Sequence, residues 1–333
     1  MKRRQILNAM IGVGTLAGAA LLAGPSPALA QGDAWPNKPI RLIVGFAPGG
    51  GTDIVARALA PRMAEVLGQQ VVVENRAGAA GTIAAEIVAN APSDGYTLLM
   101  GHSNSNAIAP FVLPKIAYDP ARDFTPITYV GYVPNVMVVH PSLQARSVAD
   151  VVALAKAKPG VYTYASSGVG STQHLAGALF AKLTDIQLTH IPYKGSGQAI
   201  VDLVAGQVSM NFDTMPPVLE HIRAGKIDAL AISTPNRLPQ LPNVPTFNET
   251  GINGFDVTNW YAVMAPRSLP TALVARIDEA VKAAMNDAAI RPKLEAQGLQ
   301  TGGPQTPAQF ADFMKAELAK YARLVKELNV KAQ

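Results

Sequence analysis

The chain has 333 residues, no cysteine, and 28 basic against 23 acidic side chains. The missing cysteine excludes disulfides, thiol catalysis and thiolate metal sites. The charge is nearly balanced and no run of basic residues occurs in the body of the chain, so we expect no nucleic-acid partner.

Residues 1–30 have the pattern of an export signal. A basic start at residues 2–4 precedes an apolar stretch over residues 10–23 and an A-x-A cleavage site that ends at Ala30. We expect cleavage after Ala30, by the Sec or the twin-arginine route, and a soluble periplasmic product. Loss of three basic residues with the leader lowers the formal net charge from +5 to +2. A membrane anchor is the alternative, but the apolar stretch is short for it.

Strand-like and helix-like patterns alternate after the leader. The first block has strand patterns at residues 40–46, 71–74 and 96–100, and helix patterns at 52–67 and 79–89. This order predicts a mainly parallel sheet. A proline-rich stretch follows, in which strands at residues 124–133 and 135–139 flank a crossing.

A second alternating block begins near residue 147. Its predicted helices are 147–156, 171–183, 198–205 and 217–224, and its predicted strands are 162–165, 188–191, 208–212 and 229–233. After a proline- and asparagine-rich segment come a strand at 260–265 and helices at 271–285, 288–297 and 307–328. We therefore predict two α/β lobes with crossings near residues 131 and 253: residues 31–131 with 253–333, and residues 132–252.

The turn between the first strand and the first helix is the clearest candidate for a binding site. It contains Pro48 and the glycines 49–51, and Thr52 and Asp53 follow. The first N–H groups of a helix have no internal partner, and the helix dipole favours negative charge there. Glycine lets such groups approach one ligand, so this turn predicts an anion site.

Three later turns also lie between a strand and a helix, at residues 165–172, 193–197 and, more weakly, 213–217. In a parallel sheet all such turns gather at the carboxyl ends of the strands, where open α/β sheets bind ligands. Residues 102–106, His-Ser-Asn-Ser-Asn, end the third strand and would place more polar groups over the same cleft. A loop that satisfies only its own backbone is the alternative.

Enzyme signatures fit poorly. No lysine follows Gly51, as a P-loop would need, and Ile54 stands where a dinucleotide fingerprint needs its third glycine. No G-x-S-x-G elbow occurs, and the five histidines are scattered, so we expect neither a metal nor a cofactor. Asp53 and Asp213 could act as acid or base, but helix capping is the usual role of a carboxylate at a helix start.

Nine motifs then identify a family. They span the mature chain in order: IRLIVGFAPGGGTDIVAR (40–57), VVVENRAGAAG (71–81), APSDGYTLLMG (91–101), YDPARDFTPI (118–127), YASSGVGSTQHLAG (164–177), HIPYKGSGQAI (190–200), FDT (212–214), LPNVPTFNETG (241–251) and WYAVMAP (260–266). The chain resembles the Bug family of tripartite tricarboxylate transporter receptors. Ala77 and Ala80 depart from the family's usual proline and glycine, but Gly78 and Gly81 remain.

The resemblance implies an α/β, type II periplasmic-binding-protein fold, in which two lobes joined by two crossings close on a ligand cleft. It also implies that loop backbone and ordered water hold one carboxylate. The residue patterns and the resemblance together give the ligand-binding residues Phe46, Pro48, Gly49, Gly50, Gly51, Thr52, Asp53, His102, Asn104, Asn106, Ser166, Gly168, Ser171, Thr172, His174, Lys194, Gly195 and Asp213.

The implied function is capture of a small organic carboxylate, with delivery to the membrane permease subunits of a tripartite tricarboxylate transporter. We expect a monomer, no catalytic residue, and a di-, tri- or aromatic carboxylate as ligand. His102, Asn104 and Asn106 are candidates for the distal end of the ligand, and Asp213 for an amino group. Two alternatives stay open: an exported enzyme that uses Asp213, His174 and Ser171, and a ligand-loaded partner of a membrane sensor.

Overall fold

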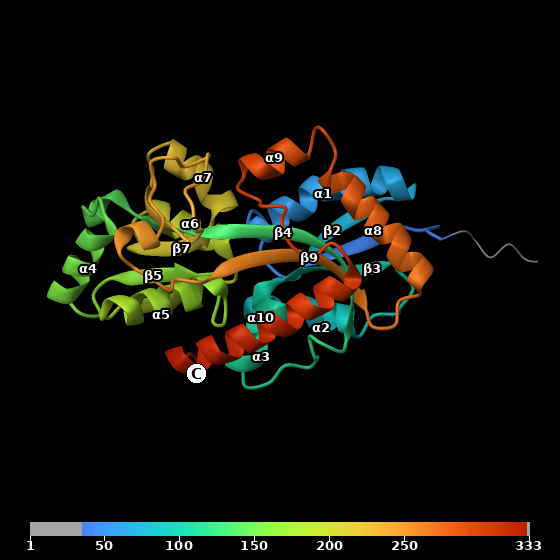
Figure 1. Cartoon of the computed structure of the whole chain (residues 1–333), viewed down its shortest axis with the longest axis horizontal. Helices are drawn as coiled ribbons and strands as arrows, with labels where there is room; N and C mark the ends of the chain where they lie inside the picture. Colours follow the sequence, from blue (N-terminus) through green and yellow to red (C-terminus); the bar gives the residue numbers. More distant parts are fainter. Residues whose placement is uncertain (1–34, 332–333) are drawn as a thin grey trace, which may run out of the picture. The chain divides into compact units, whose positions relative to one another are not determined.

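The computed structural model describes residues 35–331, so the predicted leader and its cleavage site lie outside the described residues. Helices and strands alternate through residues 38–331, as the sequence predicts (Figure 1). Among the described residues, no helix is both long enough and apolar enough to cross a membrane.

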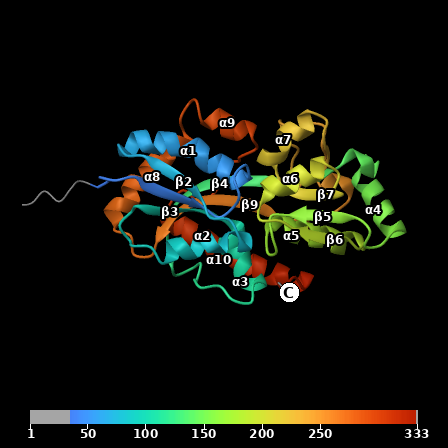
Figure 2. The ribbon, with the colours of Figure 1, turned by 180° about the vertical axis from the view of Figure 1, so that it is seen from behind.

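The first sheet holds the N-terminal strands. Its order is β2 (Val71–Asn75), β1 (Ile40–Val44), β3 (Thr97–His102), β9 (Thr258–Pro266) and β4 (Phe124–Val139). The first three strands are parallel, whereas β9 runs antiparallel between β3 and β4. One face is covered by α1 (Gly51–Leu67) and α8 (Thr271–Met285). The other is covered by α2 (Thr82–Ala89), η2 (Asn104–Ile108), α3 (Ala109–Val112) and α10 (Pro307–Leu328) (Figure 2).

The second sheet shares β4 with the first. β7 (Met210–Thr214) and β8 (Asp228–Ile232) pair antiparallel with β4, while β5 (Thr163–Ser166) and β6 (Thr189–Pro192) extend the sheet in parallel. Met137 and Val139 of β4 pack with α4 (Val148–Ala157) and α5 (Thr172–Thr184). Val136 and Val138 pack with α6 (Ser196–Val204) and α7 (Met215–Arg223). The strand thus alternates between two buried cores.

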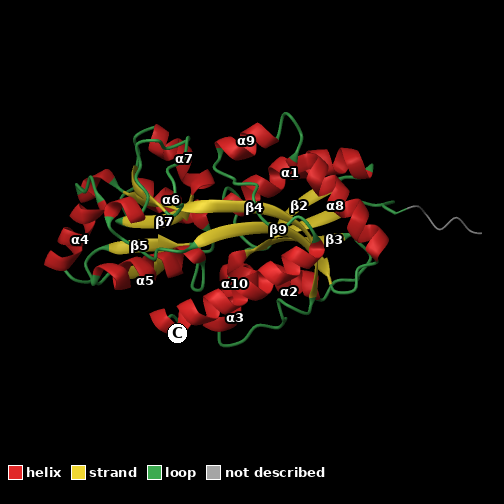
Figure 3. Cartoon of the chain, viewed as in Figure 1, coloured by secondary structure: helices red, strands yellow, loops and turns green. Residues whose placement is uncertain are grey.

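Strand β4 corrects one prediction. The sequence predicts separate strands on either side of Pro134, but the structure has one strand of 16 residues that runs through both sheets (Figure 3). Proline lacks an N–H, so it fits a strand only where no ladder bond is needed. Pro134 lies where β4 leaves its partner β9 and takes up β7, and the register shifts beside Pro126. Both prolines therefore lie at breaks in the ladder.

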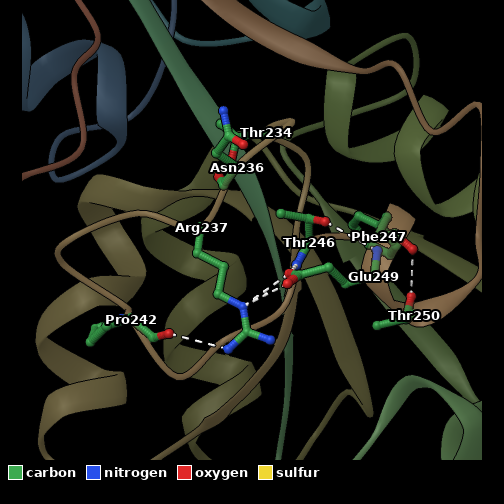
Figure 4. Close-up of polar contacts among 8 residues, drawn as sticks. All are labelled: Thr234, Asn236, Arg237, Pro242, Thr246, Phe247, Glu249 and Thr250. Atoms are coloured by element: carbon green, nitrogen blue, oxygen red, sulfur yellow. Dashed lines mark hydrogen bonds and ion pairs between the residues drawn. The ribbon is translucent and has the colours of Figure 1, made fainter.

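The segment between β8 and β9 is fastened by side chains along its own length (Figure 4). The Arg237 Nε donates to both Glu249 oxygens at 3.0 Å, and another guanidinium nitrogen donates to the Pro242 carbonyl. Glu249 in turn accepts from the Thr246 N–H at 2.7 Å, while the Thr246 hydroxyl accepts from the Glu249 N–H. Phe247 anchors this segment, because its side chain is buried in the core that contains Met137 and Val139. A loop rich in proline is therefore held in one conformation.

Helix α10 returns the chain to the first sheet. Thr306 and Gln309 form a capping box at its start, and its apolar stripe includes Phe310, Met314 and Tyr321, as the sequence predicts. The helix packs on β4, η2, α3 and α5, so it spans the region where β4 and β9 cross between the sheets (Figure 1). The remaining short helices of the described part are η1 (Ala79–Gly81), η3 (Pro141–Leu143), η4 (Asn248–Thr250) and α9 (Arg291–Ala296).

Candidate ligand site

Residues 47–53, called the first loop below, connect β1 to α1. Gly50 is the N-cap of α1 and has extended backbone, with no side chain to cap the helix. The N–H groups of Gly51, Thr52 and Asp53 find no acceptor within residues 35–331. They emerge from the helix start, where the dipole is positive. The loop therefore presents free donors, as an anion site requires.

Asp53 fixes the shape of the first loop. Its carboxylate accepts from the Gly49 N–H at 3.0 Å, from the Arg57 Nε at 3.0 Å, and from the Asn75 Nδ2 at 2.8 Å. Burial raises the pKa of the Asp53 carboxyl, but these hydrogen bonds outweigh it and lower the pKa overall. The second Asn75 contact, to the Phe46 carbonyl, anchors the start of the loop. Asp53 is thus occupied in holding the turn.

Residues 166–174, called the second loop below, run from the end of β5 into the first turn of α5. Almost every one of them takes part in a hydrogen bond. Ser171 is the N-cap and accepts from the His174 N–H at 3.2 Å. The Ser167 hydroxyl donates to Gln173 at 2.6 Å, and Ser166 both donates to the Gly168 carbonyl and accepts from the Gly168 N–H. These side chains use internally the groups that a ligand would otherwise contact.

Two histidines hold the ends of the second loop. The rings of His174 and His190 stack with centroids 3.9 Å apart and planes 9° apart. His174 Nδ1 accepts from the Gly170 N–H at 3.2 Å, and His190 Nε2 lies 2.6 Å from the Ser166 hydroxyl. Burial lowers the pKa of His174 to about 4. Burial, and then the neighbouring His174, lower the pKa of His190 to about 3. Both rings are neutral near pH 7.

The stretch after β3 is helical, not a loop. The sequence predicts that residues 102–106 end the third strand, with a loop as the alternative. His102 is the last residue of β3, but Asn104 begins η2, which runs directly into α3. Asn104 Oδ1 accepts from the Thr172 N–H at 2.9 Å, which joins this stretch to the second loop. Asn106 Oδ1 accepts from Ser105 and from the His102 N–H, while Asn106 Nδ2 is buried without a partner among the described residues.

His102 packs between two aromatic rings that are tilted relative to its own. Its ring lies between Phe46 and Tyr261, with centroids 5.0 Å and 5.2 Å away. Nδ1 accepts from the Asn104 N–H at 3.0 Å. Burial lowers the pKa of His102 to about 3, so the ring is neutral near pH 7 and adds no positive charge. These ring contacts join Phe46, the residue before the first loop, to Tyr261 of β9.

Asp213 is fully buried at the end of β7 and is saturated with donors. Its Oδ1 accepts from the Ser196 hydroxyl, from Gln173 Nε2 and from the Thr214 N–H, at 2.7, 3.0 and 2.7 Å. Its Oδ2 accepts from Asn211 Nδ2 at 2.9 Å. Burial raises the pKa of this carboxyl, and the hydrogen bonds only partly offset the rise. The carboxylate organises the starts of α5, α6 and α7 around itself.

The predicted turns meet across the two sheets. A β-carbon added at Gly197 would lie 2.8 Å from the Pro48 carbonyl oxygen, and one added at Gly195 would lie 3.0 Å from the Ala47 nitrogen. One added at Gly50 would lie 3.9 Å from the Ser196 β-carbon. The first loop therefore rests directly on the start of α6. Lys194, in contrast, is exposed.

Sequence reasoning missed several side chains of this region. Asn259 accepts from the Thr172 and Ser103 hydroxyls and donates to Asn135, so it joins β4, β9, α5 and the end of β3. Asn135 and Asn259 are fully buried. Their signal in the sequence is an asparagine inside an apolar strand, which needs a partner when it is buried. The other side chains missed for the same reason, partners distant in sequence, are Gln173 and Tyr261.

The residues of the alternative enzyme do not form a catalytic unit. The Ser171 hydroxyl caps its helix, His174 Nδ1 accepts from Gly170, and Asp213 is bonded to other groups. No hydrogen bond joins these three side chains to one another within the described part of the chain. Residues 35–331 also hold no cluster of three metal-ligating side chains.

The fold of this chain is similar to the folds of several solved structures. The Rpa4515 protein of R. palustris, solved with adipate, is 37% identical with a TM-score of 0.86 and covers 89% of this chain and 99% of its own. MatC from Rhodopseudomonas palustris, with bound malate, is 32% identical with a TM-score of 0.84, at 87% and 100% coverage. The fold is thus that of a type II periplasmic binding protein, with two α/β lobes, and the class is that of a solute receptor.

The sequence comparisons give the family. A family model described as "Tripartite tricarboxylate transporter family receptor" matches residues 55–330. Protein BugT of Bordetella pertussis is 40% identical over 300 residues, which are 90% of this chain and 92% of BugT. The chain therefore belongs to the tripartite tricarboxylate transporter receptor family, among its Bug-type members. Family members and structural neighbours are solute-binding receptors of the periplasm.

Proposed function

We propose that this protein is a periplasmic receptor that captures a small organic carboxylate between its lobes and delivers it to a tripartite tricarboxylate-type permease. One observation carries the proposal. The free N–H groups at the start of α1 lie against the helix starts of the second sheet, in a region whose other polar groups are buried. Donors without acceptors call for an anionic partner.

The energies are sufficient for a receptor. A helix dipole contributes roughly 0.3–1 kcal/mol to an exposed anion and up to about 2 kcal/mol in a partly buried site. Each hydrogen bond to a charged group adds about 1.5–3 kcal/mol. Four such bonds at the upper value total about 12 kcal/mol, which leaves the roughly 8 kcal/mol of a micromolar complex after the smallest association cost, about 4 kcal/mol, is subtracted.

The lobes that close on the ligand are proposed to be residues 31–131 with 253–333, and residues 132–252. Strand β4 runs from one to the other, and β9 pairs with its first part. Phe46, Pro48, the glycines 49–51, Thr52 and Asp53 would serve the first lobe. Gly168, Lys194 and Gly195 would serve the second, where Ser166, Ser171, Thr172, His174 and Asp213 would hold the loops in shape. His102, Asn104 and Asn106 would lie at the distal end of the ligand.

The proposed ligand is a dicarboxylate of the size of malate or adipate, with an aromatic carboxylate as the next choice. Two relatives were solved with those acids. An amino acid is less suited to this site, because each oxygen of Asp213 already accepts from protein donors. A charged amino group would have to displace one of them.

A thermal-shift panel tests the proposal. The mature protein is mixed with malate, adipate, succinate, citrate and benzoate, and with matched amines and neutral sugars. We expect stabilisation by at least one carboxylate and none by the amines or sugars, followed by a Kd from calorimetry. Stabilisation by sugars alone would rule the carboxylate receptor out.

The enzyme alternative is separated by the fate of the ligand. Mass spectrometry of the bound carboxylate before and after incubation with the protein should return the same compound. Turnover to a new product would instead favour an exported enzyme.

A further inference from the structure

The Tyr261 hydroxyl stands out among the buried polar groups of this region. The residue lies in β9, its side chain is fully buried, and its oxygen makes no hydrogen bond of good geometry within residues 35–331. The nearby hydroxyls of Thr52 and Thr214 lower the pKa of the phenol, but neither meets the distance and angle limits of a hydrogen bond to it. Buried hydroxyls without a partner are rare, and such a group calls for a ligand or water.

The direction of the side chain follows from its strand. Successive residues of a strand point to opposite sides. Trp260 points toward α10, where its Nε1 donates to Glu317 at 2.9 Å. Asn259 and Tyr261 point the other way, toward the second loop and His102. Tyr261 is therefore on the same side of the crossing strands as the candidate ligand site.

The oxygen of Tyr261 lies at the start of α1. A β-carbon added at Gly51 would be 2.6 Å from this oxygen and 2.8 Å from the Thr214 hydroxyl. The N–H groups of Gly51 and Thr52 are among those that lack an acceptor within the described residues. A glycine at position 51 thus lets the phenol approach the free donors of the helix start. The hydroxyl and these N–H groups can serve one acceptor.

The phenol keeps its proton. Burial raises the pKa of Tyr261, and the nearby Asp213 carboxylate raises it further. The hydroxyl is therefore protonated, and can donate a hydrogen bond, near pH 7. The Thr214 hydroxyl already uses its proton, because it donates to Asp213 Oδ1 at 3.3 Å.

We infer that Tyr261 is a ligand-binding residue whose hydroxyl donates to the same carboxylate group that the start of α1 receives. The inference rests on the proposed function and adds a residue to it. Because Tyr261 lies in β9, it gives the carboxylate one donor from a strand that pairs with β4, the strand shared by the two sheets. The first loop supplies the others. The site so completed selects an acidic group small enough to fit against Gly51.

The experiment compares Tyr261→Phe with the wild type, using malate and adipate as probes. We expect affinity for the acid that the wild type binds to fall by about tenfold to hundredfold, the range of one hydrogen bond to a charged group. The melting temperature of the ligand-free variant should stay unchanged or rise, because the hydroxyl has no partner to lose.

Tyr321→Phe is the matched control. Tyr321 is equally buried, but its hydroxyl donates to the Thr258 carbonyl at 3.0 Å. We expect this variant to melt at a lower temperature and to keep its affinity. If Tyr261→Phe behaves like Tyr321→Phe, the hydroxyl has a structural role and the inference is wrong, although the proposed function stands. If the wild type binds neither malate, adipate nor any other acid of the panel, the proposed function fails and the inference fails with it.

Discussion

The first and the second loop both connect a strand to a helix, yet they use their hydrogen-bonding groups in opposite ways. The first loop is shaped by its own Asp53, which Arg57 and Asn75 hold in place, and it leaves the N–H groups of its helix free. In the second loop, hydrogen bonds with Ser166, Ser171, His174 and His190 already occupy the polar groups.

The difference separates two tasks that the sequence patterns do not distinguish. Free donors suit a ligand, whereas saturated donors suit a structural joint. The second loop is such a joint: Thr172 bonds to Asn104 of η2 and to Asn259 of β9. We therefore expect changes in the first loop to act mainly on affinity and changes around the second loop to act mainly on stability.

The largest effect is expected at Asn259. Asn259→Ala removes the acceptor of Thr172 and the donor to Asn135, and leaves both buried groups unsatisfied. We expect the free energy of unfolding in urea to fall by about 3–5 kcal/mol, from lost hydrogen bonds and a small cavity.

Asn90→Ala is the control for that measurement. The exposed Asn90 donates only to the carbonyl of Glu86. Its loss should change the free energy of unfolding by less than about 0.5 kcal/mol. Equal effects of the two variants would contradict the role of the second loop as a joint.

Gly50→Asp tests the first loop in the opposite sense. The position has ordinary backbone angles and room for a β-carbon, and aspartate is a favoured N-cap. The new carboxylate would occupy the free N–H groups and repel an anion. We expect affinity for the carboxylate ligand to fall by roughly 100-fold or more, with an unchanged or higher melting temperature. Calorimetry of Gly50→Ala, which adds no charge, provides the comparison; equal affinities in both variants would refute the anion site.

Sequence patterns predicted most elements and both loops because glycine and serine at helix starts are local signals. They failed where the deciding contact is distant. The division of β4 at Pro134 was wrong because pairing with β9 on one side and β7 on the other is decided by partners more than 70 positions away. For residues 102–106 the sequence predicts a strand end or a loop, because serine and asparagine disfavour helices, yet η2 begins at Asn104 and Tyr118 donates to the Ser105 carbonyl there.

The candidate site shows the same limit. Asn135, Asn259 and Tyr261 lie among apolar neighbours in strands, so local pattern reasoning assigns them to the core. Only the pairing of β9 with β3 and β4 brings them beside the two loops. A buried polar residue in such a strand marks a site only once its partners are known.

The pH dependence of stability should reflect the histidines of the second loop. An unfolded histidine takes up a proton near pH 6.5, whereas burial lowers the pKa of folded His174 to about 4. Between these values only the unfolded chain binds the proton. The stability is therefore fully present above about pH 6.5 and is lost as pH falls toward 4. In urea titrations at pH 7 and pH 5, His174→Gln should lose about 1–2 kcal/mol less than the wild type. The same loss in both proteins would contradict this assignment.

The smallest effect is expected where the first loop rests on α6. Gly197→Ala would place a β-carbon 2.8 Å from the Pro48 carbonyl oxygen, too close for an unshifted contact. The variant should keep its fold but bind the carboxylate about fivefold to tenfold more weakly, roughly 1 kcal/mol, because the two loops cannot approach as closely. Gly302→Ala is the control, since a β-carbon there meets nothing within 4 Å. Calorimetry measures the affinity of both variants for the carboxylate. If Gly197→Ala binds it as tightly as Gly302→Ala does, the contact between the first loop and α6 does not contribute to binding.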